Sequence, residues 1–425
     1  MPPAPANQLS LNDIVENGLC IGCGLCKSVA QPEQVELVTT PEGRERPVAQ
    51  HPLSQEAITR INAICPGTQI AGPALNGQPQ GVELDTVWGA AERISIGHAT
   101  DPEVRFRAST GGVLTALGQF LVDSRRVNFV LHVGASPSAP MRSSRKLSFD
   151  AISVLDAAGS RYGPAPLADF CEVLDRKEPF ALIAKPCDIT AVRNLAKIDP
   201  RVDQYMRYAL TFLCGGASDF TKSEDVLAGF GLREEELRLF RYRGYGNPGL
   251  TRVETTDGRA FGLTYQQLWE DESKWMIQPR CKICADAIGL AADVVASDVW
   301  PGGGPTGEDE GYNGIIVRTP RGLELYEAAI AAGKLTVLQP ATFRDFDVFQ
   351  PHQVRKRRAI WARFCGLQSA GKPIPETTNL NIKDCARQNS LADNLREARG
   401  ARDRAKRGRL GEPQPIARSE YRSSD

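Results

Sequence analysis

Eight of the eleven cysteines in this chain fall into two sets whose spacing suits ligation by thiolates. The members of the two sets are Cys20, Cys23, Cys26 and Cys65, and then Cys187, Cys214, Cys281 and Cys284. Cysteine thiolates ligate iron–sulfur clusters and structural zinc. In a cytoplasmic chain disulfides are disfavoured, because that compartment keeps thiols reduced. Two four-cysteine sets that share no residue therefore predict an electron-transfer protein.

The first set begins with a C-x2-C-x2-C run in which glycines lie between the cysteines. Such glycines let the backbone wrap a cube of iron and sulfide and point its amide groups at the sulfurs. The bacterial ferredoxin run continues with x3-C-P, but Ala30 stands at that cysteine position and the distant Cys65-Pro66 supplies the pair. The segment resembles half of a bacterial ferredoxin, with one 4Fe-4S cluster. Zinc is the alternative, although zinc sites usually place their cysteines in two separated pairs.

The second set lies in a region where strand and helix patterns alternate, which predicts an α/β (mixed α+β) fold. We expect strands at residues 127–133, 152–155, 180–184, 208–213, 293–296 and 315–319, a hairpin at 252–265, and helices at 113–121, 167–174, 188–195 and 323–332. Asp188 is expected to cap one helix, and Thr221 and Glu224 to form the capping box of another. Cys187 and Cys214 each follow a predicted strand, at the edge where open α/β sheets bind ligands.

A Ser-Thr-Gly-Gly turn precedes the predicted helix at 113–121. Its residues are Ser109, Thr110, Gly111 and Gly112. Backbone amides at the start of a helix form a ready anion site, which suits a pyrophosphate. The alternative is a plain helix N-cap by Ser109 or Thr110.

Composition excludes several other classes of protein. The 51 basic and 51 acidic residues cancel, so overall charge gives no argument for nucleic acid or a membrane. No apolar run approaches a membrane span, and the first residues lack the pattern of a secretory signal, so we expect a cytoplasmic protein. The chain has no hydrolase elbow and no phosphate-binding loop of the Walker or dinucleotide type.

Three regions are expected along the chain. Residues 1–75 form a ferredoxin-like 4Fe-4S segment, with the first ten residues disordered, and residues 71–81 read as a linker. Residues 85–345 form the main α/β domain with a central iron–sulfur site. Residues 346–425 form a helical, partly disordered tail, in which the basic residues after Glu397 could also serve as a docking site for an acidic electron donor.

Several stretches of the main domain together resemble the coenzyme F420 hydrogenase/dehydrogenase beta subunit family. The matching stretches are Ser109 to Gly112, Lys185-Pro186-Cys187, Arg241-Tyr242-Arg243-Gly244, Cys281 to Cys284 with Asp286, Ala292-Asp293 with Asp298, and Gly311 through Arg318. This family includes the beta subunit of F420-reducing hydrogenase. It also includes ferredoxin-dependent reductases of 7-hydroxymethyl chlorophyll a and divinyl chlorophyllide.

The resemblance implies FAD and one 4Fe-4S cluster in the main domain. The implied cluster ligands are Cys187, Cys214, Cys281 and Cys284. The Ser109–Gly112 turn would contact the flavin, and Lys185, Asp298 and Arg318 are further expected cofactor contacts. With the N-terminal set, the chain would hold two clusters. Asp298, Lys185 and His98 are candidates for a proton donor, although no catalytic residue is assigned.

The expected function is that of an iron–sulfur flavoprotein oxidoreductase. Electrons would pass from a one-electron donor such as ferredoxin through two 4Fe-4S clusters to FAD and on to a small organic acceptor, in a chain that could form homo-oligomers. One alternative is a coenzyme F420-linked electron-transfer beta subunit of a larger complex. Another is a zinc-stabilised binding protein without turnover.

Overall fold

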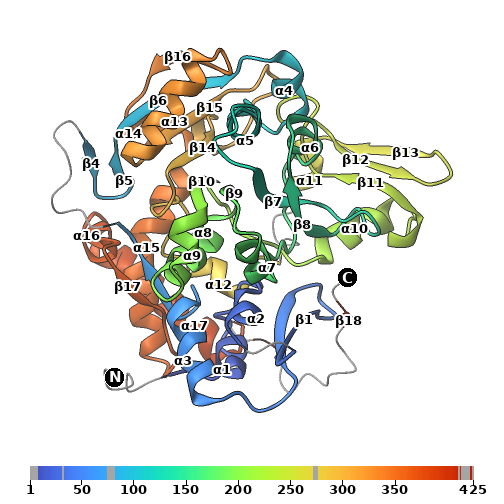
Figure 1. Ribbon diagram of the computed structural model, residues 1–425. Helices are drawn as coiled ribbons and strands as arrows, with labels where there is room; N and C mark the ends of the chain where they lie inside the picture. Colours follow the sequence, from blue (N-terminus) through green and yellow to red (C-terminus); the bar gives the residue numbers. More distant parts are fainter. Residues whose placement is uncertain are drawn as a thin grey trace.

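The computed structural model describes residues 8–30, 33–73, 82–270, 276–409, 412 and 422–423. An eight-stranded sheet, with strands in the order β16-β6-β15-β14-β10-β9-β7-β8, organises the fold (Figure 1). Its strands are β6 (Arg93–Ala99), β7 (Phe129–Ala135), β8 (Ser143–Ser148), β9 (Phe180–Ile183), β10 (Met206–Phe212), β14 (Val294–Asp298), β15 (Asn313–Val317) and β16 (Leu335–Pro340). The expected mixed α/β class is confirmed.

The four central strands are parallel, and antiparallel strands complete both sides of the sheet. Strand β10 pairs in parallel with β9 and β14, and β9 pairs in parallel with β7. Strands β15, β6 and β16 continue antiparallel on one side, and β8 on the other. The carboxyl ends of β9, β10 and β14 therefore meet at one edge, which puts Cys187, Cys214 and Asp298 on the same side of the sheet.

Apolar side chains that alternate along the strands pack against helices on both faces. Helices α5 (Val113–Asp123) and α13 (Pro320–Ala331) cover one face, where Leu117 and Leu325 are fully buried. Helix α8 (Pro186–Ala196) covers the other, where Val192 and Leu182 of β9 belong to one buried core that extends to the N-terminal segment and the C-terminal helices.

A small lobe extends from the main sheet. Strands β11 (Leu237–Arg241), β12 (Thr251–Thr255) and β13 (Ala260–Leu263) form an antiparallel sheet that packs on α10 (Thr221–Gly229). The hairpin expected about Asp257 and Gly258 is confirmed. The 3-10 turn η1 (Glu234–Glu236) precedes it, and α11 (Tyr265–Trp269) follows it.

The N-terminal segment and the C-terminal helices lie together on one side of the main sheet (Figure 1). The segment contains α1 (Leu11–Glu16), α2 (Leu25–Val29), β1 (Val35–Thr39), β2 (Glu45–Ala49), α3 (Gln55–Ile64) and β3 (Gln69–Ala71), and the C-terminal part contains α14 (Phe343–Phe349), α15 (Pro351–Gln368), β17 (Glu376–Thr378), α16 (Ile382–Arg387), α17 (Leu391–Lys406) and β18 (Arg422–Ser423). Strand β3 pairs with β17, and β1 with both β2 and β18. One apolar core joins both parts to the main domain.

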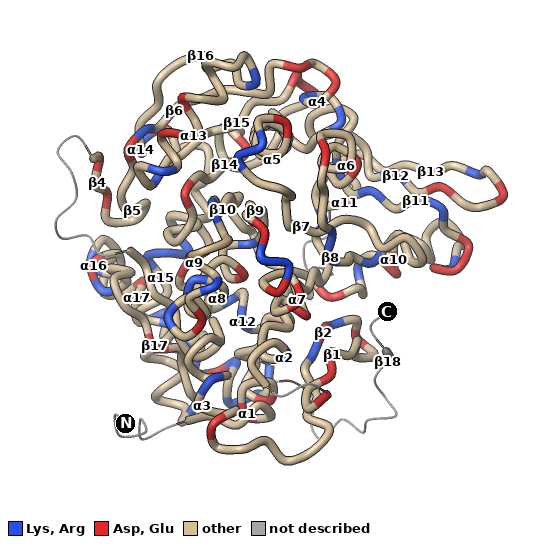
Figure 2. The backbone as a smooth tube through the Cα atoms, viewed as in Figure 1, with Lys and Arg blue, Asp and Glu red and all other residues tan. Residues whose placement is uncertain are grey.

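The remaining elements are short and connect the larger ones. They are β4 (Glu83–Asp85), β5 (Gly89–Ala91), α4 (Pro102–Arg107), α6 (Ala151–Asp156), α7 (Phe170–Asp175), α9 (Arg201–Tyr205), α12 (Pro279–Lys282) and the 3-10 turn η3 (Pro301–Gly303). Basic and acidic residues are interspersed along the backbone (Figure 2). No helix among the described residues is both long enough and apolar enough to cross a membrane.

Three local expectations were wrong. Residues 152–155 belong to helix α6, because Asp150 caps it and Ser153 completes the capping box. Neither Thr221 nor Asp188 is an N-cap, since α10 starts after Phe220 and α8 after Lys185.

Residues 1–7 and 74–81, which contain most of the expected disordered start and the linker, lie outside the described part of the chain.

Candidate redox site

The N-terminal cysteines converge around a tightly packed loop. Gly22 and Gly24 have φ values of 69° and 78°, and a Cβ atom on Gly22 would lie 2.6 Å from the Glu45 carbonyl oxygen, so the loop requires glycine. The Gly22 amide donates to Cys20 Sγ at 3.3 Å, and the Gly67 amide donates to Cys65 Sγ at 3.3 Å. Amide–sulfur hydrogen bonds of this kind are typical of iron–sulfur sites.

The central cysteines come from three separate segments of the chain. Cys187 lies in the first turn of α8, Cys214 follows β10, and Cys281 and Cys284 lie on and just after α12. The Ala217 amide donates to Cys281 Sγ at 3.4 Å. Burial, followed by the charge of Cys281, raises the pKa of Cys214 to about 12, and Cys284 contributes further.

Burial also raises the pKa of the N-terminal thiols. The pKa of Cys65 rises to about 11, first because of burial and then because of the neighbouring charge of Cys20. Buried thiols that oppose one another's ionisation are protonated near neutral pH. Ligation of iron by Cys65 and Cys214 as thiolates would therefore release protons.

Helix α15 holds the loops that carry the central cysteines. Gln353 donates to the Cys214 carbonyl oxygen at 2.9 Å, and Arg363 to the Lys282 carbonyl oxygen at 2.7 Å. The fully buried Arg357 donates to the Ala285 carbonyl oxygen at 2.6 Å. The region expected to be a tail therefore positions the central site.

The two cysteine sets lie beside each other. Arg280, the neighbour of Cys281, is buried and donates to the Pro66 carbonyl oxygen at 2.7 Å, directly after Cys65. This single side chain ties the loop of one set to the helix of the other.

Two further cations lie between the sets. Arg46 donates to Gln278, the N-cap of α12, at 3.1 Å. Burial alone would lower the pKa of Arg46, but the charges of Cys20, Glu412 and Cys281 raise it. Lys185 pairs with Asp188 at 2.7 Å, beside members of both sets.

The donor set fits iron–sulfur clusters in its chemistry: four convergent thiols, glycine loops and amides directed at sulfur. No group of three or more His, Cys, Asp or Glu side chains among the described residues is arranged to hold a single metal ion. A cubane is a different arrangement, because the iron–sulfide cube keeps its ligand sulfurs apart. The eight cysteine ligands remain a prediction.

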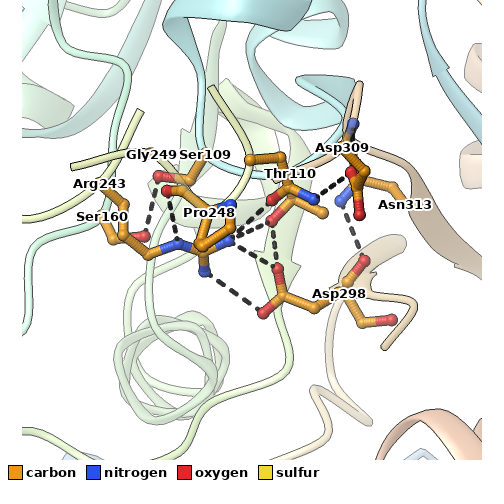
Figure 3. A network of polar contacts seen from close by, with 12 residues as sticks. Ser109, Thr110, Ser160, Arg243, Pro248, Gly249, Asp298, Asp309 and Asn313 are labelled. Atoms are coloured by element: carbon orange, nitrogen blue, oxygen red, sulfur yellow. Dashed lines mark hydrogen bonds and ion pairs between the residues drawn. The ribbon is translucent and has the colours of Figure 1, made fainter. Parts of the chain in front are cut away.

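A second site lies at the ends of β14 and β15, where a buried guanidinium meets a carboxylate (Figure 3). Arg243 Nη2 pairs with Asp298 Oδ1 at 3.1 Å and donates to Asn247 Oδ1 at 3.1 Å. Thr110 donates to Asp298 and accepts from Arg243 at 3.3 Å. Burial alone would lower the pKa of Arg243, but the Asp298 carboxylate raises it above the ordinary value.

The Ser109–Gly112 turn contributes to this site through its backbone shape. Thr110 has a φ of 64° and Gly112 a φ of 75°, and Gly112 is the N-cap of α5. The alternative of a side-chain cap by Ser109 or Thr110 is wrong, because α5 has no side-chain cap at its N-cap residue. Instead the Asn313 carboxamide oxygen, from the neighbouring strand, accepts from the Val113 amide at 3.1 Å.

A shallow, open hollow of about 290 Å³ lies at the same end of the sheet. It is lined by Ile96, Val299, Tyr312, Leu338, Gln339 and Phe349. Val299 follows Asp298 in the chain, and Tyr312 precedes Asn313, so the hollow is built from neighbours in sequence of two network residues. Small-molecule sites commonly combine an apolar hollow with a few placed polar groups.

The structure separates the other expected contacts from this network. Lys185 lies with the cysteines and donates to the Ala165 carbonyl oxygen at 2.5 Å. Arg318 is buried and donates to the carbonyl oxygens of Trp88 and Ile288, each at 2.8 Å. His98 lies against Tyr312, with 6.0 Å between the ring centroids. Of the expected cofactor contacts outside the Ser109–Gly112 turn, Asp298 alone belongs to the network with Arg243 and Thr110.

Arg243 lies in one of the stretches that match the family, but no role for it was expected from the sequence. Asn247, Asp309 and Asn313, which complete the network, were also not expected. The sequence does show Arg243 near a run of glycines, which is a sign of a tight loop. Its pairing with Asp298 could not be read from the sequence, because Asp298 lies 55 positions away.

Comparison with known proteins identifies the family of the chain. The family model for the N-terminal part of the coenzyme F420 hydrogenase/dehydrogenase beta subunit matches residues 94–172, and that for its C-terminal part matches residues 177–342, more than half of the chain. The chain belongs to the coenzyme F420 hydrogenase/dehydrogenase beta subunit family.

Relatives within this family share low identity with the chain. The coenzyme F420 hydrogenase subunit beta of Methanococcus voltae is 21% identical, over 65% of this chain and 95% of the relative. The F420-dependent formate dehydrogenase subunit beta of Methanocaldococcus jannaschii is 24% identical, over 57% of this chain and 61% of the relative. A chain of the F420-reducing [NiFe] hydrogenase complex from Methanosarcina barkeri aligns over 65% of this chain and 95% of its own length, with a TM-score of 0.48 and 18% identity.

Proposed function

We propose that this chain is an electron-transfer oxidoreductase subunit that carries a flavin and two 4Fe-4S clusters and exchanges electrons with a coenzyme F420-type carrier. The observation that carries this proposal is that Arg280 joins the two cysteine sets at the edge of the sheet where the strands before Cys187, Cys214 and Asp298 end, in a chain of this family. Cys20, Cys23, Cys26 and Cys65 would hold one cluster, and Cys187, Cys214, Cys281 and Cys284 the other.

The names of the relatives favour the F420-linked alternative over a ferredoxin-dependent reductase of an organic acceptor. They are beta subunits of a hydrogenase and of a formate dehydrogenase, both linked to F420. We therefore also propose that this chain works with partner proteins. Ferredoxin remains a second proposed donor, supported by the cysteine set that precedes the residues matched by the family models.

The chain's own residues would have distinct tasks. Arg243 and Asp298 fix each other and Thr110, which sets the position of the turn at the ligand site. The open hollow lined by Val299 and Tyr312 would offer apolar contact to one side of a planar ring. A bound flavin, FAD in our proposal, would supply exchange of single electrons with the clusters and of a hydride with the carrier.

Anaerobic purification of the full chain tests the proposal directly. We expect a yellow-brown protein with flavin and about eight irons per chain, counted as two cubanes. Reduced F420 should bleach the flavin absorbance, whereas reduced ferredoxin should do so only if ferredoxin is the donor. Zinc without flavin would contradict the proposal and support a zinc-stabilised binding protein.

A further inference from the structure

Arg241, the last residue of β11, has no anionic partner among the residues that the structure describes. It is half-buried, and its buried Nε has no hydrogen-bond acceptor. Its guanidinium lies over the Tyr245 ring, 3.9 Å from the centroid. The neighbouring Arg252, which is opposite Arg241 on β12, pairs with Glu254 at 2.6 Å. Arg241 therefore differs from the other arginines of its sheet.

Arg241 lies next to the ligand site. A Cβ atom on Gly159 would be 3.9 Å from Arg241 Cγ and 3.1 Å from the Arg243 carbonyl oxygen. Ser160, the residue after Gly159, donates to Ser109 Oγ at 2.9 Å (Figure 3). The loop at residues 159–160 thus connects the unpaired guanidinium to the turn.

A second cation and exposed aromatic rings complete this surface. Arg107 lies over the same Tyr245 ring at 5.8 Å, and its Nε is also buried without an acceptor. Arg107 pairs with Asp156 at 3.0 Å and with Glu103 at 3.9 Å, so its charge is balanced locally while its Nε keeps a free donor. Phe106 and Tyr245 meet edge to face with 5.5 Å between centroids, and they are 52% and 43% exposed. An aromatic face holds a guanidinium in place without neutralising it.

The first free amide of α5 is not available to an anion, because Asn313 occupies it. Arg161, the residue after Ser160, also lacks a carboxylate partner, but its guanidinium donates to the Phe240 and Met141 carbonyl oxygens. Among the described arginines around the turn, Arg241 is the one whose guanidinium has neither a carboxylate nor a carbonyl acceptor. A planar guanidinium with free donors suits bidentate recognition of phosphate. Burial lowers the pKa of Arg241, and Tyr245 and Glu254 offset this effect only in part.

We propose that Arg241, assisted by Arg107 and the ring of Tyr245, binds a phosphate group of the ligand held at the Thr110–Arg243–Asp298 site. This inference rests on the proposed function insofar as that ligand is a phosphate-bearing redox cofactor. The phosphate belongs either to the tightly bound flavin or to the exchanging carrier, and the two sources give different results in the following test.

The test compares the full chain with Arg241→Gln, Arg241→Lys and the matched control Arg252→Gln, all purified anaerobically. Flavin per chain is measured by absorbance, and binding of inorganic pyrophosphate by calorimetry. If the carrier brings the phosphate, pyrophosphate binds the flavin-loaded protein and Arg241→Gln weakens this binding about tenfold or more, as expected for a charge-assisted hydrogen bond. If the flavin brings it, Arg241→Gln lowers flavin per chain.

The control variants separate phosphate binding by Arg241 from a general effect of losing a positive charge in this sheet. Arg252→Gln should match the parent protein in both measurements, and Arg241→Lys should fall between parent and Arg241→Gln because a point charge lacks the planar fork. Unchanged flavin content together with unchanged pyrophosphate binding in Arg241→Gln would overturn the inference. Flavin content and pyrophosphate binding can both be measured without turnover of F420. A parent chain that fails to react with F420 would therefore count against the proposed function without changing either measurement.

Discussion

At the scale of single residues, the Arg243–Asp298 pair explains why the turn at Thr110 has its shape. Arg243 is almost fully buried, 4.6 Å from the Trp300 ring, and its donors reach three oxygen-bearing side chains. Buried cations are retained where their donors are satisfied. Because the Asp298 side chain is 26% exposed, part of its acceptor capacity remains open to a ligand. A lysine could supply the charge but not the fork of donors.

Arg243→Lys should therefore weaken ligand binding and leave the overall fold intact. We expect the affinity for flavin to fall about tenfold, because at least one charge-assisted hydrogen bond is lost. Flavin dissociation is measured by fluorescence after dilution. Arg238→Lys is the control, since Arg238 is exposed and pairs with Glu254 in the small lobe. Equal dissociation constants for both variants would contradict a role of Arg243 at the site.

At the scale of elements, the sequence predicts strands and loops better than it predicts their partners. The glycine loop at Gly22 and the strand ends before Cys187 and Cys214 follow from local patterns. The position of helix α15 does not, because its contacts with Cys214 and Ala285 join residues far apart in sequence. Residues 152–155 show where prediction from a short pattern fails. These four residues are compatible with a strand, but the capping box of Asp150 favours a helix.

The Cys65 loop offers a test at this scale. A Cβ atom on Gly67 would lie 2.4 Å from the Leu19 carbonyl oxygen and 3.2 Å from Cys65 Sγ. Gly67→Ala should push this loop away from Cys20, and iron should fall from about eight to about four per chain as one cubane is lost. Gly215→Ala beside Cys214 is the matched control, because nothing lies within 4 Å of its added Cβ. Full iron content in Gly67→Ala would show that the loop can adapt.

At the scale of the whole molecule, the N-terminal segment is built into the main domain. Strand β3 pairs with β17, and Arg280 ties the two cysteine sets together. The sequence predicted the two sets and the edge of the sheet, since both depend on local spacing. It could not predict that the sets are neighbours, because that depends on Arg46, Arg280 and Lys185, whose contacts form only in the folded chain.

This arrangement predicts different roles for the two sets in electron transfer. In Cys26→Ser, loss of the N-terminal cluster should slow exchange with a one-electron donor by an order of magnitude or more, whereas hydride exchange between F420 and the flavin should change little. In Cys284→Ser, loss of the central cluster should interrupt the proposed relay between donor and flavin even if the N-terminal cluster remains. Stopped-flow absorbance measures both reactions, and electron paramagnetic resonance of the reduced protein reports which cluster is present. If Cys26→Ser and Cys284→Ser accept electrons from the one-electron donor as fast as the parent chain, the two sets do not form a relay.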